Sequence, residues 1–155
     1  MSTRLRDEIK QTRPFACPEQ EAYLSLGRTW AVLEHALAEA LRPHGITPTQ
    51  YNVLRILRGA GDGGLCRSEV MERMVARVPD ATRLLDRMEA AGLIARERSS
   101  EDRRFVTTRI TGQGLELLAE LDGVVVDLHQ RQFSALDEEE LRGLIALLGL
   151  VRESA

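Results

Sequence analysis

The sequence is poor in aromatic residues and cysteine, and each scarcity argues against a class of protein. Only 4% of its 155 residues are aromatic, whereas leucine, alanine and arginine are abundant, which favours a mostly helical chain over a β-sandwich. The two cysteines, Cys17 and Cys66, lie far apart without a secretory signal, so we expect reduced thiols and a cytoplasmic location. No apolar run approaches the roughly 18 residues of a membrane span, and no membrane partner is expected.

The acidic net charge of −3 conceals an uneven distribution along the chain. Residues 1–66 carry 8 basic and 7 acidic side chains, residues 67–111 carry 10 and 8, and residues 112–155 carry 3 and 9. The acid is therefore concentrated in the last third. Because binding to DNA depends on the local potential, a mildly basic centre beside an acidic end permits a nucleic-acid partner.

The first half of the chain predicts an arm and two helices. Residues 1–17 are polar and without period, which indicates a flexible N-terminal arm. Apolar residues at helical spacing then predict an amphipathic helix over 18–42, which Pro43 ends. A second helix begins near residue 48, because Thr47 occupies the N-cap position and Gln50 the N3 position of a capping box.

Two short helices and a β-hairpin are expected next. Cys66 stands where a serine N-cap is usual, with Glu69 at N3, and a fourth helix follows the break at Val78-Pro79. Two strands, at about 93–98 and 104–110, then surround a polar turn. Short helices that meet at a tight break and are followed by a hairpin are typical of a winged helix-turn-helix.

The remaining sequence predicts a long helix capped by Thr111 and a final helix capped by Asp137. The apolar residues of the final helix, from Leu141 to Val151, would form an exposed stripe in a monomer, so a partner helix is expected. The fold class is therefore mainly α with a small β-hairpin.

Arginines dominate the expected DNA-contacting surface. Arg83 and Arg87 are four residues apart on one face of the fourth helix, and a solvated face partly neutralised by Asp86 and Glu89 is the alternative. At the wing, the Asp102 carboxylate is expected to stabilise the hairpin tip, which suits its arginines to phosphate or minor-groove contact. The residues expected to contact DNA are Arg67, Arg77, Asp80, Thr82, Arg83, Arg87, Arg103 and Arg104.

Three segments resemble the MarR (multiple antibiotic resistance regulator) family of winged helix-turn-helix regulators. Residues 102–111 resemble its Asp-x-Arg-x5-Leu-Thr signature, with Ile110 in place of the leucine and Arg104 as the signature arginine. Residues 47–51 are similar to the start of the family's second helix, and residues 82–94 to its recognition helix entering the wing. The resemblance implies one MarR-like domain over 18–152, with a winged-helix DNA-binding lobe (46–111) between two sets of dimerisation helices (18–42 and 112–152).

The resemblance also implies a homodimer that binds a pseudo-palindromic operator and responds to a small phenolic or lipophilic effector. A repressor is expected on this basis. The residues expected to line an effector site, unless Trp30 and Tyr51 belong to the core, are Trp30, His35, Tyr51, Arg55 and His129.

Other functions find less support in the residues. A redox sensor would use Cys17 or Cys66, and a winged helix that docks a protein would use its apolar helices for that partner. Three isolated histidines predict no metal site, and the glycine-rich loop 59–64 lacks the Lys-Ser/Thr of a phosphate-binding loop. We therefore expect neither a cofactor nor an enzyme.

Overall fold

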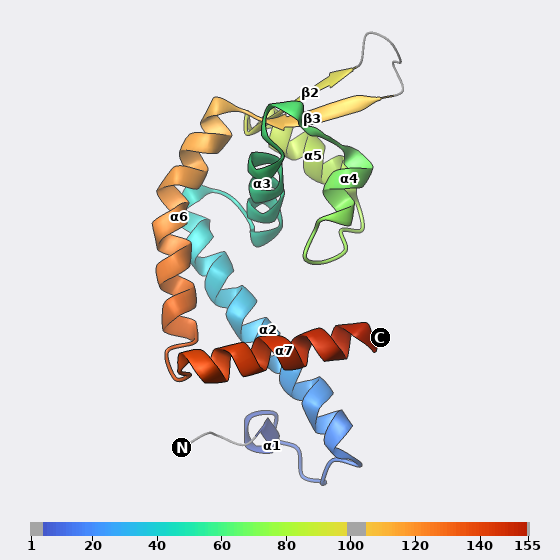
Figure 1. Cartoon of the computed structure of the whole chain (residues 1–155), viewed down its shortest axis with the longest axis vertical. Coiled ribbons are helices and arrows are strands. Elements are labelled where there is room, and N and C mark those ends of the chain that lie inside the picture. The colour runs from blue at the N-terminus through green and yellow to red at the C-terminus, as the bar shows by residue number, and fades with distance from the viewer. Residues whose placement is uncertain (1–4, 99–104, 155) are drawn as a thin grey trace.

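The computed structural model describes residues 5–98 and 105–154, which form a mainly helical chain with a small antiparallel sheet at one end (Figure 1). The wing residues Asp102, Arg103 and Arg104 lie outside the described residues. In chain order, the elements are α1 (Leu5–Glu8), α2 (Pro18–Leu41), η1 (Arg42–His44), α3 (Pro48–Ala60), η2 (Gly61–Gly63), β1 (Leu65–Cys66), α4 (Arg67–Glu72), α5 (Ala81–Ala90), β2 (Ile94–Arg98), β3 (Val106–Ile110), α6 (Gly112–Gln132) and α7 (Glu138–Glu153).

The capping signals set the helix boundaries as predicted. At the start of α3, the Gln50 N–H donates to Thr47 Oγ1 at 3.2 Å, and the Thr47 N–H donates to Gln50 Oε1 at 2.9 Å. Asp137 and Glu140 form the same reciprocal pair at the start of α7, with distances of 2.8 and 2.9 Å. Each pair satisfies two backbone donors that the first helical turn leaves without an intrahelical acceptor.

Within the residues that the structure describes, the sheet contains three strands in the order β1-β3-β2, one more than the expected hairpin. β2 and β3 pair from Ile94↔Ile110 to Arg98↔Val106, while β1 adds two residues to the other edge of β3. Sequence periodicity missed β1 because two residues show no alternation. Gly64 makes this close approach possible: its φ is +64°, and a Cβ there would lie 2.6 Å from the Thr108 carbonyl oxygen.

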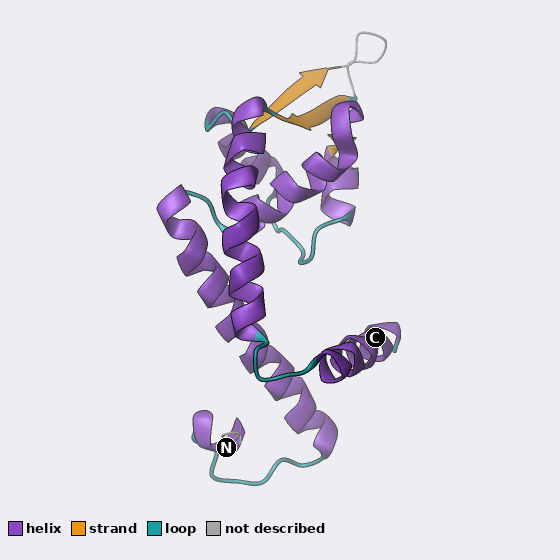
Figure 2. Ribbon diagram, turned by 60° about the vertical axis from the view of Figure 1, so that its left-hand side comes forward, coloured by secondary structure: helices purple, strands orange, loops and turns teal. Residues whose placement is uncertain are grey.

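The buried core lies in the lobe formed by α3, α4, α5 and the sheet, and it continues along α6. Its largest fully buried side chains are Leu41, Val53, Leu54, Leu57, Val70, Leu85, Met88, Ile94, Thr108, Leu118 and Leu121. The long helices α2 and α6 extend away from this lobe, and α7 follows the end of α6 that is far from the lobe (Figures 1 and 2). The N-terminal end of α2 and α1 lie farther still from the lobe. Among the described residues, α7 buries none of its side chains within the single chain.

The segment before α2 contains a short helix that contacts α2. Within the segment expected to be a flexible arm, α1 forms one helical turn, and Arg28 of α2 donates to the Glu8 carboxylate at 3.5 Å. The described helices include none with the length and apolarity needed to cross a bilayer.

Candidate nucleic-acid interface

Helix α5 coincides with the fourth helix that the sequence predicted, and its two sides have different surroundings. Leu85 and Met88 are 1% and 0% exposed and anchor one side of the helix in the lobe core. At the N-terminus, Asp80 Oδ1 accepts a hydrogen bond from the Arg83 N–H at 3.0 Å, which fixes where the helix begins. The other side of α5 therefore faces solvent in a defined orientation.

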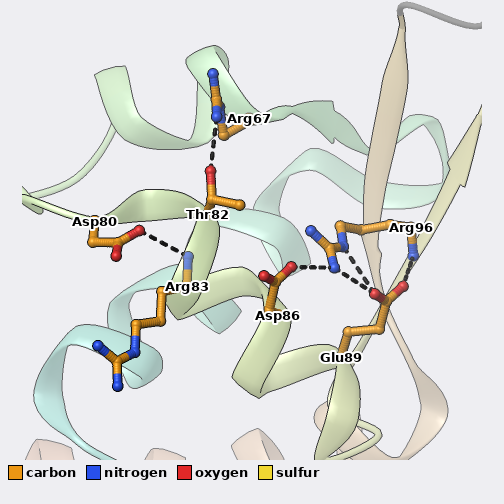
Figure 3. A network of polar contacts seen from close by, with 7 residues as sticks. All are labelled: Arg67, Asp80, Thr82, Arg83, Asp86, Glu89 and Arg96. Atoms are coloured by element: carbon orange, nitrogen blue, oxygen red, sulfur yellow. Dashed lines mark hydrogen bonds and ion pairs between the residues drawn. The ribbon is translucent and has the colours of Figure 1, made fainter.

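A side-chain hydrogen bond joins the two helices of the helix-turn-helix. Arg67, the first residue of α4, donates from Nη1 to Thr82 Oγ1 at 2.8 Å (Figure 3). Both side chains are exposed, so the bond lies on the outer surface of the lobe. It places a cation beside the N-terminal turn of α5, where the helix dipole also favours anions.

The arginines of α5 project outward. Arg83 and Arg87 are exposed, and within residues 5–98 and 105–154 neither side chain forms an ion pair or hydrogen bond. Figure 3 shows Arg83 extending away from the cluster of Asp86, Glu89 and Arg96. Two guanidinium groups one helical turn apart can bind phosphates or guanine edges. Of the remaining candidates, Asp80 caps α5 and Arg77 is exposed in the loop before it.

Arg96 was not among the predicted site residues; it lies on β2 and binds two carboxylates of α5. Its Nη2 donates to Asp86 Oδ1 and to Glu89 Oε2, both at 2.6 Å, and its backbone N–H donates to Glu89 Oε1 at 3.0 Å (Figure 3). The hydrogen bond from Arg96 lowers the pKa of Glu89 below its ordinary value, and the same bond raises the pKa of Arg96. The available signal was an arginine two residues after Ile94, on the strand face that points inward.

A second arginine of the sheet, Arg109, binds η2 and β2 and does not bind α5. Arg109 on β3 donates from Nε to the Asp62 carbonyl at 2.7 Å and from Nη1 to Glu97 at 3.1 Å. These bonds tie the sheet to η2 and leave α5 untouched.

Comparison with known proteins identifies a segment that contains most of the lobe, from α3 to β2. The MarR family model matches residues 44–104. The transcriptional repressor MdtR of Bacillus subtilis (strain 168) is 32% identical over 118 residues, covering 76% of this chain and 75% of its own length. A MarR transcription factor from Planctomyces limnophilus is 37% identical, with a TM-score of 0.69 and coverage of 88% of this chain and 99% of that one.

This chain belongs to the MarR family. It is accordingly a transcriptional regulator and not an enzyme. A mutant MarR from E. coli, crystallised with operator DNA, superposes with a TM-score of 0.77 at 25% identity, over 96% of this chain and 99% of the other.

A cavity of about 600 Å³ lies between the lobe and the long helices of this MarR-family chain. Four of the five predicted effector residues line it: Trp30, Tyr51, Arg55 and His129. His35 is exposed on α2 and is not part of the lining. Tyr51 is 6% exposed and also belongs to the core, whereas Trp30 is 50% exposed within the single chain.

The two cysteines have different surroundings. Cys17 is exposed, while Cys66 is half-buried at the N-cap of α4, where its N–H donates to Glu69 Oε2 at 2.7 Å. That backbone hydrogen bond lowers the pKa of Glu69. Cys66 Sγ lies 2.9 Å from Ser68 Oγ. The described part of the chain brings no three histidine, cysteine or acidic side chains together in a way that could hold a metal ion.

Proposed function

We propose that this chain is a sequence-specific repressor that binds double-stranded DNA. The observation that carries the proposal is the outward face of α5, where Thr82, Arg83 and Arg87 are exposed beside the Arg67–Thr82 bond. α5 has ten residues, and an α-helix with its side chains is about 10–12 Å across, which fits a major groove about 12 Å wide. MdtR, which is named a transcriptional repressor, and the E. coli MarR–operator complex support the proposal.

A homodimer explains the apolar surface that a single chain leaves exposed. On α7, Ile145, Leu147 and Leu150 are 65%, 63% and 60% exposed, and Tyr23 and Trp30 of α2 are also exposed. A second copy of the chain covers such a surface in a two-fold arrangement. Two lobes related by this axis contact half-sites about one helical turn apart, which makes the operator a pseudo-palindrome.

The dimer is tested by light scattering after size-exclusion chromatography. Ile145→Glu places a charge on the α7 stripe and is expected to shift the chain toward monomer. Val75→Glu is the matched control, since Val75 is 74% exposed but lies in the loop between α4 and α5. A monomeric parent, or an Ile145→Glu variant as dimeric as the parent, would refute this part of the proposal.

The 600 Å³ cavity is the proposed site of the effector. Its lining joins Trp30 of α2 and His129 of α6 to Arg77 in the loop that leads to α5, so an occupant contacts both the long helices and the recognition unit. The aromatic and cationic lining suits a small aromatic acid. Shifting a two-state balance from 1:99 to 99:1 takes about 5.5 kcal/mol of differential affinity between the two conformations.

A gel shift on the DNA upstream of the chain's own gene tests DNA binding directly. We expect a specific shift at moderate salt, competed by the same unlabelled duplex and not by a scrambled one. Addition of salicylate, as a probe of the aromatic-acid class, is expected to release the DNA from the parent and less so from Arg55→Ala, since Arg55 lines the cavity and is not among the residues expected to contact DNA.

The same experiment separates the alternatives. A folded dimer that gives no specific shift would favour a winged-helix module that docks a protein. Release of DNA by peroxide in the parent, but not in Cys17→Ser or Cys66→Ser variants, would favour a cysteine-based redox regulator.

A further inference from the structure

Helix α5 by itself carries no net positive charge with which to attract DNA phosphates. It carries two arginines, Arg83 and Arg87, and two acidic residues, Asp86 and Glu89, so its formal charges cancel. Asp86 is four residues after Thr82 and three after Arg83. This spacing places Asp86 on the same side of the helix as the exposed side chains of Thr82 and Arg83. An uncompensated carboxylate there would oppose the approach of α5 to DNA phosphates.

Arg96 supplies the missing countercharge from outside the helix. One nitrogen, Nη2, contacts both Asp86 and Glu89 at 2.6 Å, and Nε adds a second bond to Glu89 at 3.0 Å. With the backbone N–H of Arg96, both Glu89 oxygens bind the same residue of β2. The bonds are charge-assisted and the Arg96 side chain is 23% exposed, while solvent partly screens the Asp86 and Glu89 side chains, which are 55% and 38% exposed.

The sheet holds Arg96 in position for this contact. Arg96 pairs with Thr108 of β3, which is 1% exposed, and follows Ile94, which is 2% exposed, on the inward face of β2. Its backbone is therefore fixed at the point where β2 passes α5. No other cation in residues 5–98 or 105–154 pairs with Asp86 or Glu89.

We propose that Arg96 is a positioning residue for DNA binding, which draws the carboxylates of Asp86 and Glu89 toward β2 and leaves the outer face of α5 to Arg83 and Arg87. The inference rests on the proposed DNA-binding function. In this arrangement the wing strand sets the charge of the recognition helix as well as its orientation.

Fluorescence anisotropy with the full chain and a labelled duplex from the upstream DNA tests the role of Arg96. We expect Arg96→Gln to weaken specific binding by about tenfold or more, since two carboxylates lose their partner. The triple variant Asp86→Asn, Glu89→Gln, Arg96→Gln keeps the shapes and removes all three charges. It is expected to bind within about threefold of the parent, because no carboxylate then opposes the phosphates.

The matched control is Arg109→Gln, which removes an arginine ion pair from the neighbouring strand of the same sheet without touching α5. Circular dichroism and thermal melting establish that each variant is folded. Arg96→Gln binding like the parent, the folded triple variant binding no better than Arg96→Gln, or an equal loss in Arg109→Gln would each overturn the inference. A parent that binds no DNA would instead overturn the proposed function.

Discussion

Arg58 and Asp122 form a two-pronged ion pair, with Nη1 and Nη2 donating to Oδ2 and Oδ1 at 2.8 and 2.9 Å. The pair joins α3 of the lobe to α6, so it connects the DNA-binding unit to a long helix 64 residues later in the chain. Hydrogen bonding from Arg58 lowers the pKa of Asp122, and the same bond raises the pKa of Arg58. A guanidinium that donates two parallel hydrogen bonds to one carboxylate fixes the relative orientation of the two groups as well as their distance.

Asp122→Asn is expected to reduce the free energy of unfolding by about 1 kcal/mol at neutral pH, because solvent screens a pair whose side chains are 34% and 48% exposed. A lowered folded-state pKa means that the ionised Asp122 stabilises the fold above the unfolded value of 3.8. This stabilisation is lost as the pH falls below that value through the folded-state pKa. Urea titrations between pH 7 and pH 2 measure it.

The control for this pH dependence is Asp127→Asn, which removes an exposed carboxylate from the same helix. We expect the Asp127→Asn profile to run parallel to that of the parent, and the Asp122→Asn profile to be flatter below pH 4. If the Asp122→Asn profile also ran parallel to the parent's, the ion pair would contribute nothing to stability.

Variants of the arginines proposed to contact DNA are expected to differ in what they lose, which is either discrimination between sequences or overall affinity. In the proposed function α5 enters the groove, so Arg83→Ala is expected to lose about 1–3 kcal/mol of discrimination between operator and scrambled DNA. Arg104 is proposed to contact the DNA backbone, so Arg104→Ala is expected to weaken both complexes about equally. Binding isotherms on both duplexes measure this, with Arg142→Ala on α7 as the control. Parent-like binding by both variants would remove α5 and the wing from the interface.

Thr111 connects the end of α5 to the start of α6. Its hydroxyl donates to the Gly92 carbonyl at 2.6 Å and accepts from the Gly114 N–H at 3.1 Å. Thr111→Ala is expected to cost about 1–2 kcal/mol, because both bonds are partly buried. Thr111→Ser keeps the hydroxyl and should lose less than half as much. Chemical denaturation of both variants decides the matter, and equal losses would show that the methyl group, and not the hydroxyl, is responsible.

Two glycines of α6 should respond oppositely to alanine. A Cβ at Gly114 would meet the Leu93 carbonyl oxygen and the Ile110 side chain, whereas a Cβ at Gly123 would meet nothing within 4 Å. Gly114→Ala is therefore expected to destabilise the fold by about 1–3 kcal/mol, while Gly123→Ala gains up to about 1 kcal/mol of helix propensity. Melting temperatures test the pair. A stable Gly114→Ala variant would mean that α6 moves freely against the hairpin.

Local signals predicted most of the fold because they act within a few residues. The capping residues Thr47, Thr111 and Asp137 bind backbone donors three positions later, so their sequence context is sufficient. The short strand β1 was missed because its partner Thr108 lies 43 positions after Leu65. The predicted strand at 93–98 begins one residue later, at Ile94.

The sequence by itself determined the order of the longer helices and the hairpin strands, where the capped helices begin, and the outward arginines Arg83 and Arg87, since helical periodicity and capping depend on neighbouring residues. Tertiary structure decided which charges meet. Arg96 pairs with Asp86 and Glu89, and Arg58 with Asp122, because strand pairing and helix packing bring distant residues together. Ion pairs are short-ranged in space and carry no fixed spacing in sequence, so folding is required to choose their partners.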